Sequence, residues 1–191
     1  MAKKQNSKLK LRKGKKRWFP VLGPKAYNET EITRITAYDP ESLLNRHITI
    51  ILKALTNSAR DSNVSIKLKI NQVKGDTAYT DNIGIETSDN QVSRFSRRKS
   101  TRILNVFNTK DKNDNSIKLK TVILVNENIT RAKQNELRLF SESLINKKLS
   151  KSTYNEVFTS DFIKKLSFGL KKDLKPIYPI NDVIIWKANL Q

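Results

Sequence analysis

The residues best suited to chemistry are five cations gathered into one short stretch near the middle of the chain. Between positions 93 and 103 the sequence contains no acid and five basic residues, which are Arg94, Arg97, Arg98, Lys99 and Arg102. A solvated charged surface normally mixes both signs. A run of one sign therefore indicates a polyanionic ligand, and a phosphate backbone is the first candidate.

The basic stretch continues into a segment that reads as a β-strand, Ile103 to Asn108. Its β-branched and aromatic side chains suit a pleated, half-buried surface. Ser88 is placed to cap a short helix over residues 90–96, whose C-terminal end favours cations through the helix dipole. We therefore expect these cations to be held in a definite geometry against the core.

The overall charge supports the same kind of ligand. Among 191 residues, 38 Lys and Arg face 18 Asp and Glu, which leaves a formal net charge of +20. Like charges repel one another in a compact state, and binding to a nucleic acid would relieve this repulsion. An anionic membrane surface would too, but the mean hydropathy is −0.60. No apolar run approaches the roughly 20 residues of a membrane-spanning helix.

The first seventeen residues predict a tail that is disordered alone and orders on RNA. They hold no acid and nine cations, which are Lys3, Lys4, Lys8, Lys10, Arg12, Lys13, Lys15, Lys16 and Arg17. Fully extended, this tail would reach roughly 55–60 Å at about 3.4 Å per residue. With no apolar secretory segment there, we expect a cytoplasmic protein. Residues 18–191 are expected to form a single domain, with Trp18 plugging the edge of its core.

Several kinds of catalytic site have no residues to build them. The chain has no cysteine and one histidine, His47, and it lacks the glycine-rich, HExxH and GxSxG motifs. Asp111 and Asp114 lie close enough in sequence to suggest a Mg²⁺ site, but acids in a lysine-rich hairpin loop are ordinary turn formers. We therefore expect no enzyme activity, no cofactor and no metal.

The pattern along the chain predicts an α+β fold with an antiparallel, barrel-like core of hairpins and helices mostly in the last third. Strands are expected at residues 31–36, 47–52, 64–70, 73–80, 103–108, 116–125 and 178–186. Gly75 and Asp76 form a credible primed hairpin turn. Helices are expected after Asp39-Pro40, over 131–148, and from a capping box at Thr153 to Lys175-Pro176.

These motifs, in this order, resemble the archaeal and eukaryotic small ribosomal subunit protein family S3Ae, also called eS1. The most specific piece is residues 95–103, Phe-Ser-Arg-Arg-Lys-Ser-Thr-Arg-Ile, which is similar to the arginine-rich segment of that family. The other pieces lie along most of the chain, at Trp18-Phe19, Gly23-Pro24-Lys25, Asp39-Pro40-Glu41, Lys69-Ile70, Thr109-Lys110-Asp111 and Ile177-Tyr178-Pro179-Ile180.

The resemblance implies a β-barrel protein with flanking helices on the platform of the small subunit, near the 3′ end of the rRNA and the mRNA exit. Its implied partners are small-subunit rRNA and neighbouring platform proteins, with a contact to mRNA left open. Two alternatives remain from the residues alone. One is a free RNA-binding factor, and the other is an RNA-processing enzyme that uses His47, Asp111 or Asp114.

Overall fold

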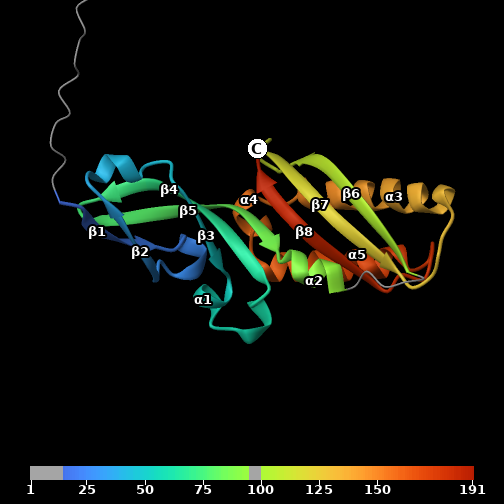
Figure 1. Ribbon diagram of the computed structural model, residues 1–191. Coiled ribbons are helices and arrows are strands. Elements are labelled where there is room, and N and C mark those ends of the chain that lie inside the picture. The colour runs from blue at the N-terminus through green and yellow to red at the C-terminus, as the bar shows by residue number, and fades with distance from the viewer. Residues whose placement is uncertain (1–14, 95–99) are drawn as a thin grey trace, which may run out of the picture.

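The computed structural model describes residues 15–94 and 100–191, with the backbone alone at Arg94. Figure 1 shows an elongated molecule, with β1 to β4 towards one end and the larger helices at the other. The long strand β5 runs between the two halves. Within these described ranges, no helix is long and apolar enough to cross a membrane.

The N-terminal half is built from five strands and four short helical turns. The strands are β1 (Arg17–Leu22), β2 (Glu31–Ala37), β3 (His47–Ile51), β4 (Val64–Lys74) and β5 (Thr77–Thr87). The turns between them are η1 (Lys25–Tyr27), η2 (Pro40–Leu43), α1 (Lys53–Thr56) and η3 (Ala59–Asp61). The expected helix after Asp39 is thus a single 3₁₀ turn, with proline at its first position.

Strand β4 follows the predicted alternation of apolar and polar side chains. Ile66, Leu68 and Ile70 are fully buried, and the lysines between them lie at the other face. At the end of the strand, Lys74 pairs with Thr77 across a two-residue turn. Gly75 takes a positive φ of 59° there, as a primed turn requires. The predicted hairpin is confirmed.

The C-terminal half combines three antiparallel strands with four helices. The strands are β6 (Thr101–Lys110), β7 (Ser116–Val125) and β8 (Asp182–Leu190). The helices are α2 (Asp89–Arg94), α3 (Arg131–Leu149), α4 (Tyr154–Val157) and α5 (Ser160–Leu174). The predicted capping box is present at the start of α4, where Thr153 and Glu156 bond to each other's backbone N–H groups.

The strands form one open sheet, in the order β2-β1-β5-β8-β7-β6, with β4 also pairing β5 and β3 pairing β4. A barrel would need the edge strand β3 to pair with β2 or with β6, and neither pair is present among the described strands. The α+β class is confirmed, but the barrel-like closure is not. The reason is that β5 pairs with β1 near one end and with β8 near the other, which extends the sheet instead of curling it.

Gly84 allows the two halves to join where β5 meets β8. It pairs with Asn189, and a Cβ atom at this position would lie 2.9 Å from the carbonyl oxygen of Ala188. A larger residue would therefore separate the two strands at the joint.

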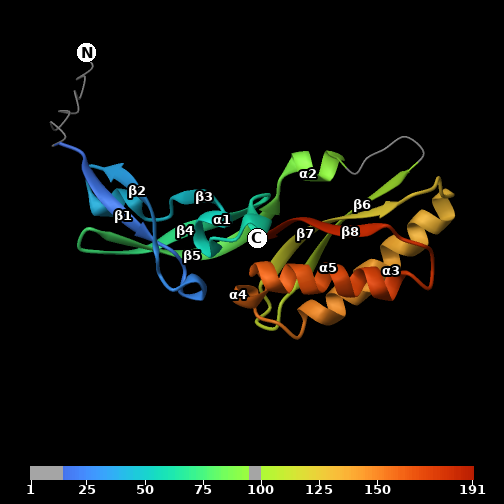
Figure 2. The ribbon, with the colours of Figure 1, turned by 90° about the horizontal axis from the view of Figure 1, so that it is seen from below.

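The main core lies between the sheet and the helices α3 and α5, which cover the same face (Figure 2). Leu137 and Ile145 of α3 and Leu166 and Leu170 of α5 are buried in it. Asn105 of β6 donates hydrogen bonds to the α3 backbone and to a serine on that helix, 3.2 Å each. We call this the inner face of β6, β7 and β8, and the opposite side the outer face.

Candidate nucleic-acid interface

The two ends of the central basic stretch are both attached to the outer face. Arg94 ends α2, and Arg102 is the second residue of β6, exposed and in register with Leu124. Helix α2 is held down by Val92, which is buried against Val122 and Leu124. Arg97, Arg98 and Lys99 lie outside the described residues. At its described ends the stretch is fixed to the sheet, as the sequence predicted.

The outer face itself carries a band of cations that the linear pattern did not reveal. It results from alternation along β6 and β7, where every second side chain points away from the helices. Across the two strands, Asn108 pairs with Lys118 and Val106 with Lys120. The exposed basic and apolar side chains of this band are Arg102, Leu104, Val106, Lys110 and Lys118. A surface with cations and exposed apolar groups suits both phosphates and bases.

Trp186 of β8 lies within this band, between two lysines. The ammonium nitrogen of Lys120 is 5.7 Å from the centre of the indole ring, and that of Lys187 is 5.3 Å from it. The indole Nε1 donates a 2.7 Å hydrogen bond to Asp89 of α2. The ring is therefore fixed in place, and its neighbours supply positive charge.

Glu86 of β5 partly neutralises one edge of the band. It forms ion pairs with Lys187 and, at 2.9 Å, with Lys67. Burial raises the pKa of Glu86, but the hydrogen bonds from these two lysines outweigh burial and leave its pKa below the ordinary value. Arg102, Lys118 and Lys120 have no ion-pair partner among the described residues, so these cations remain available to a ligand.

The described end of the basic tail also meets the sheet. Lys15 and Lys16 are exposed, and the Lys16 ammonium lies 5.4 Å from the centre of the Tyr38 ring. Arg17 opens β1 and lies 3.7 Å from an exposed carboxylate of Asp76. The six remaining cations of the predicted tail lie outside the described residues, namely Lys3, Lys4, Lys8, Lys10, Arg12 and Lys13.

Trp18 does not plug the core, so the prediction for this residue was wrong. Its side chain is 66% exposed, whereas that of Phe19 is fully buried with Val21. Because neighbouring residues of a strand point to opposite faces, only one of two adjacent aromatics can enter the core. The signal was the alternation of Phe19 and Val21, which reveals β1 itself, a strand that the sequence analysis did not predict.

The residues of the catalytic alternative are engaged elsewhere or dispersed. Asp111 is buried and accepts a 2.6 Å hydrogen bond from the backbone N–H of Tyr154, and another from Asn113. Asp114 has a φ of 60° and pairs with Lys110 at 3.4 Å. Both act as turn formers, as the sequence indicated. His47 is exposed in β3, opposite Lys69, with no described carboxylate within ion-pair distance.

Comparisons with known proteins identify related chains along nearly the whole sequence. The model of the Ribosomal S3Ae family matches residues 3–191. A small ribosomal subunit protein eS1 of Methanothrix thermoacetophila is 30% identical over 178 residues, which is 92% of this chain and 83% of the relative. The eS1 protein of Methanoculleus marisnigri is 26% identical over 100% of this chain and 98% of its own length. That of Nanoarchaeum equitans is 26% identical over 86% and 83%.

The matched residues include every element that forms the outer face. The family model covers the tail, the basic stretch, both halves of the sheet and the final strand β8. Proteins of this family are structural rather than catalytic, and they belong to the ribosome of the cytoplasm. The chain is a member of the Ribosomal S3Ae family.

Proposed function

We propose that this protein is a structural constituent of the small ribosomal subunit that binds its rRNA on the platform, near the mRNA exit and the 3′ end of the rRNA. It would thereby support subunit assembly and translation. The observation that carries the proposal is the outer face, where Arg102, Lys118 and Lys120 have no acidic partner among the described residues and Lys120 lies beside the fixed Trp186. The location on the platform follows from the resemblance to the family, whose curated relatives are named as small-subunit proteins.

The outer face and the central basic stretch would form one contact surface. Helix α2 and strand β6 hold the two ends of that stretch at Val122 and Leu124, on the same face of β7 as Lys118 and Lys120. In this arrangement Arg94, Arg97, Arg98, Lys99 and Arg102 contact phosphates, which fixes position while RNA shape gives selectivity. Neighbouring platform proteins, and mRNA at the exit, would meet the remaining surface.

The tail would act separately from this surface. Residues 1–17 order on RNA and run into its crevices, while residues 18–191 act as one domain. If the nine cations of the tail neutralise about eight phosphates of single-stranded RNA, log K should fall with log salt with a slope near −6. A slope near −1 for the tail peptide would remove this role.

The decisive experiment is co-sedimentation of the full chain with small subunits through high-salt sucrose. The native chain should stay in the small-subunit peak. A variant with Arg97, Arg98 and Arg102 changed to alanine should be depleted from it, because phosphate contacts supply most of the affinity. The matched control removes three exposed cations from the helices that cover the inner face, Lys147, Lys165 and Lys172, and should sediment like the native chain.

A free RNA-binding factor is the second candidate, and the 66% exposure of Trp18 favours it, because single-strand binders stack bases on exposed aromatics. Such a factor binds RNA but washes off the subunit in high salt. Loss of the native chain from the subunit peak, with binding to short RNA retained, would select this candidate and contradict the structural role.

A further inference from the structure

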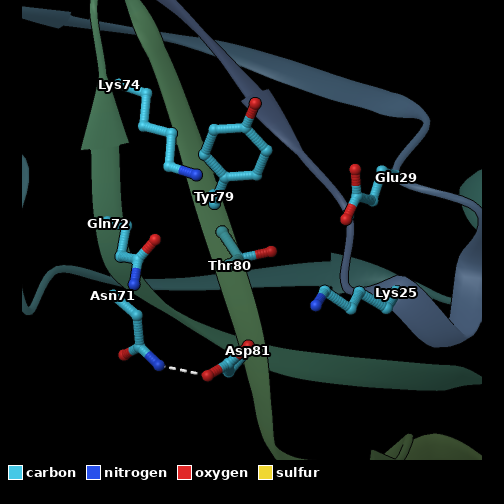
Figure 3. Close-up of a pocket in the computed structure, with 9 residues that line it drawn as sticks. Lys25, Glu29, Asn71, Gln72, Lys74, Tyr79, Thr80 and Asp81 are labelled. Carbon is cyan, nitrogen blue, oxygen red and sulfur yellow. Dashed lines mark hydrogen bonds between the residues drawn. The ribbon is translucent and has the colours of Figure 1, made fainter.

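A pocket in the N-terminal half differs in character from the basic outer face. Its volume is about 490 Å³, within the range of pockets that hold small organic ligands. It lies between β5, the end of β4 and the loop that follows β1, as Figure 3 shows. The side chains that matter are Tyr79 from β5, Lys74 from β4, and Lys25 and Glu29 from the loop.

The charges lining this pocket are balanced. Lys25 and Lys74 face two carboxylates, Glu29 and Asp81, in a chain whose net charge is +20. A surface that contacts phosphate alone would exclude acids, as the outer face largely does. The ligand of this pocket therefore combines an anionic group with hydrogen-bond donors.

The two carboxylates are not equivalent. Asp81 accepts a hydrogen bond from the side-chain amide of Asn71, marked by the dashed line in Figure 3. Glu29 is exposed at the rim, and no described residue bonds to its carboxylate. Asn28 and Glu29 both adopt positive φ, 57° and 50°, within a loop closed by a 2.9 Å hydrogen bond from Gly23 N–H to Thr30. The loop thus holds Glu29 in a backbone conformation that few residues with side chains adopt.

A free carboxylate is acceptor-only and best satisfied by two adjacent N–H donors. Among the four RNA bases, guanine offers such a pair on its Watson–Crick edge, from N1 and N2. The edge is accessible when the base is unpaired, which is the usual state of RNA bases that proteins read. Glu29 therefore favours guanine over adenine, cytosine and uracil.

The other side chains fit the remaining parts of a nucleotide. Tyr79 is half-buried and presents an aromatic ring, on which any base can stack. The Lys74 ammonium lies over one face of that ring, 5.5 Å from its centre, so the base would stack on the opposite face. Lys25 extends toward β5 from the opposite side of the pocket (Figure 3). The two ammonium groups are placed to meet the phosphates on either side of a stacked base.

We propose that this pocket binds one unpaired guanosine of an RNA strand, with Tyr79 stacking the base, Glu29 accepting from N1 and N2, and Lys25 and Lys74 contacting the flanking phosphates. The inference rests on the proposed function, since it assumes that the protein works on RNA. It adds a base-selective contact to surfaces that otherwise read phosphate and shape.

The test compares two short fluorescent RNAs, oligouridines with a single central guanosine or adenosine, by anisotropy with the full chain at one ionic strength. Contacts of the tail and outer face with phosphate are the same for both probes, so the ratio of the two dissociation constants isolates the pocket. We expect about tenfold tighter binding of the guanosine probe, the usual discrimination of a bidentate contact. Glu29→Gln should reduce this ratio to about one.

Two further variants sharpen the result. Tyr79→Leu should weaken the binding of both probes by about tenfold, because stacking does not depend on which base is present. Glu142→Gln, a matched change of charge on α3, should leave the ratio intact. Excess GMP should compete weakly, since it carries only one of the two phosphates that flank a guanosine within an RNA strand.

Equal binding of both probes by the native chain, or a ratio unchanged by Glu29→Gln, would overturn the proposal. GMP that binds as tightly as the RNA would also overturn it, and would assign the pocket to a free nucleotide. These outcomes leave co-sedimentation with the small subunit unaffected. A result that refutes guanosine binding in this pocket is therefore distinguishable from one that refutes the proposed function.

Discussion

Strands β6, β7 and β8 have an inner face that packs against the helices and an outer face that is exposed and basic. On the inner face, Ile103, Phe107 and Leu119 are buried beneath the helices. On the outer face, their neighbours Arg102 and Lys118 are exposed and lack acidic partners among the described residues. The period of two in a strand lets one stretch of sequence carry both roles. Stability and RNA binding should therefore be separable by mutating adjacent residues.

The largest expected effect comes from the inner face. Leu119→Ala should lower the free energy of unfolding by about 2–5 kcal/mol, because it removes a buried side chain and leaves a cavity. Lys118→Ala, one residue away, should change it by no more than about 0.5 kcal/mol. Urea denaturation of both variants measures the difference. Equal losses at the two positions would show that the faces are not independent.

The next effect concerns RNA binding by the outer face. Changing Arg102, Lys118 and Lys120 together to alanine should lower the salt slope of rRNA binding by about 2–3, since each phosphate contact contributes about 0.7–0.9. At physiological salt this corresponds to about a hundredfold weaker binding. The free energy of unfolding should fall by about 1 kcal/mol or less, mainly from the lost contact of Lys120 with Trp186.

An unchanged slope in that triple variant would remove the outer face from the RNA interface. The control is the helix-side triple variant at Lys147, Lys165 and Lys172, whose slope should match that of the native chain. A loss of folding instead of binding would mean that the cations of the outer face are structural.

A smaller effect on stability is expected where a buried acid of η3 pairs with a lysine of helix α5. Asp61 is buried, and it accepts hydrogen bonds from Lys164 at 2.6 Å, Ser160 at 3.1 Å and Thr56 at 2.9 Å. Burial raises the pKa of Asp61, but these bonds outweigh burial and leave its pKa below the ordinary value of 3.8. Asp61→Asn should cost about 1–3 kcal/mol at neutral pH.

The pH dependence of this group has a definite sign. Because its folded pKa is lowered, the stability it contributes is fully present above its ordinary pKa and is lost as pH falls through the folded pKa. Acid titration of the free energy of unfolding should therefore show a loss below about pH 4 that Asp61→Asn reduces. A variant with the same acid profile as the native chain would contradict this assignment.

Much of this architecture was predictable because it is local. The alternation in β4, the strand Ser116–Val125 and the capping box at Thr153 each depend on neighbouring residues, and each is confirmed. The open sheet was not predictable in this way. It depends on β5 pairing with both β1 and β8, and no local pattern encodes which distant strands meet.

The same distinction applies to the candidate site. Arg102 was predicted because it belongs to a run of cations in the sequence. The group formed by Lys120, Trp186 and Lys187 was missed, because its members are brought together by the pairing of β7 with β8. The pocket around Tyr79 and Glu29 likewise joins a strand to a loop some fifty residues earlier. Sites assembled by pairing need the fold before they can be recognised.

The smallest expected effect tests the same principle of alternation at the other end of the molecule. Trp18 is exposed and Phe19 is buried in the small core that also contains Val21 and Ile70. Trp18→Ala should change the free energy of unfolding by no more than about 0.5 kcal/mol. Phe19→Ala should lower it by about 3–5 kcal/mol. If thermal or urea unfolding shows the larger loss of stability for the Trp18 variant, the tryptophan is the core plug, and strand β1 must turn its opposite face to the core.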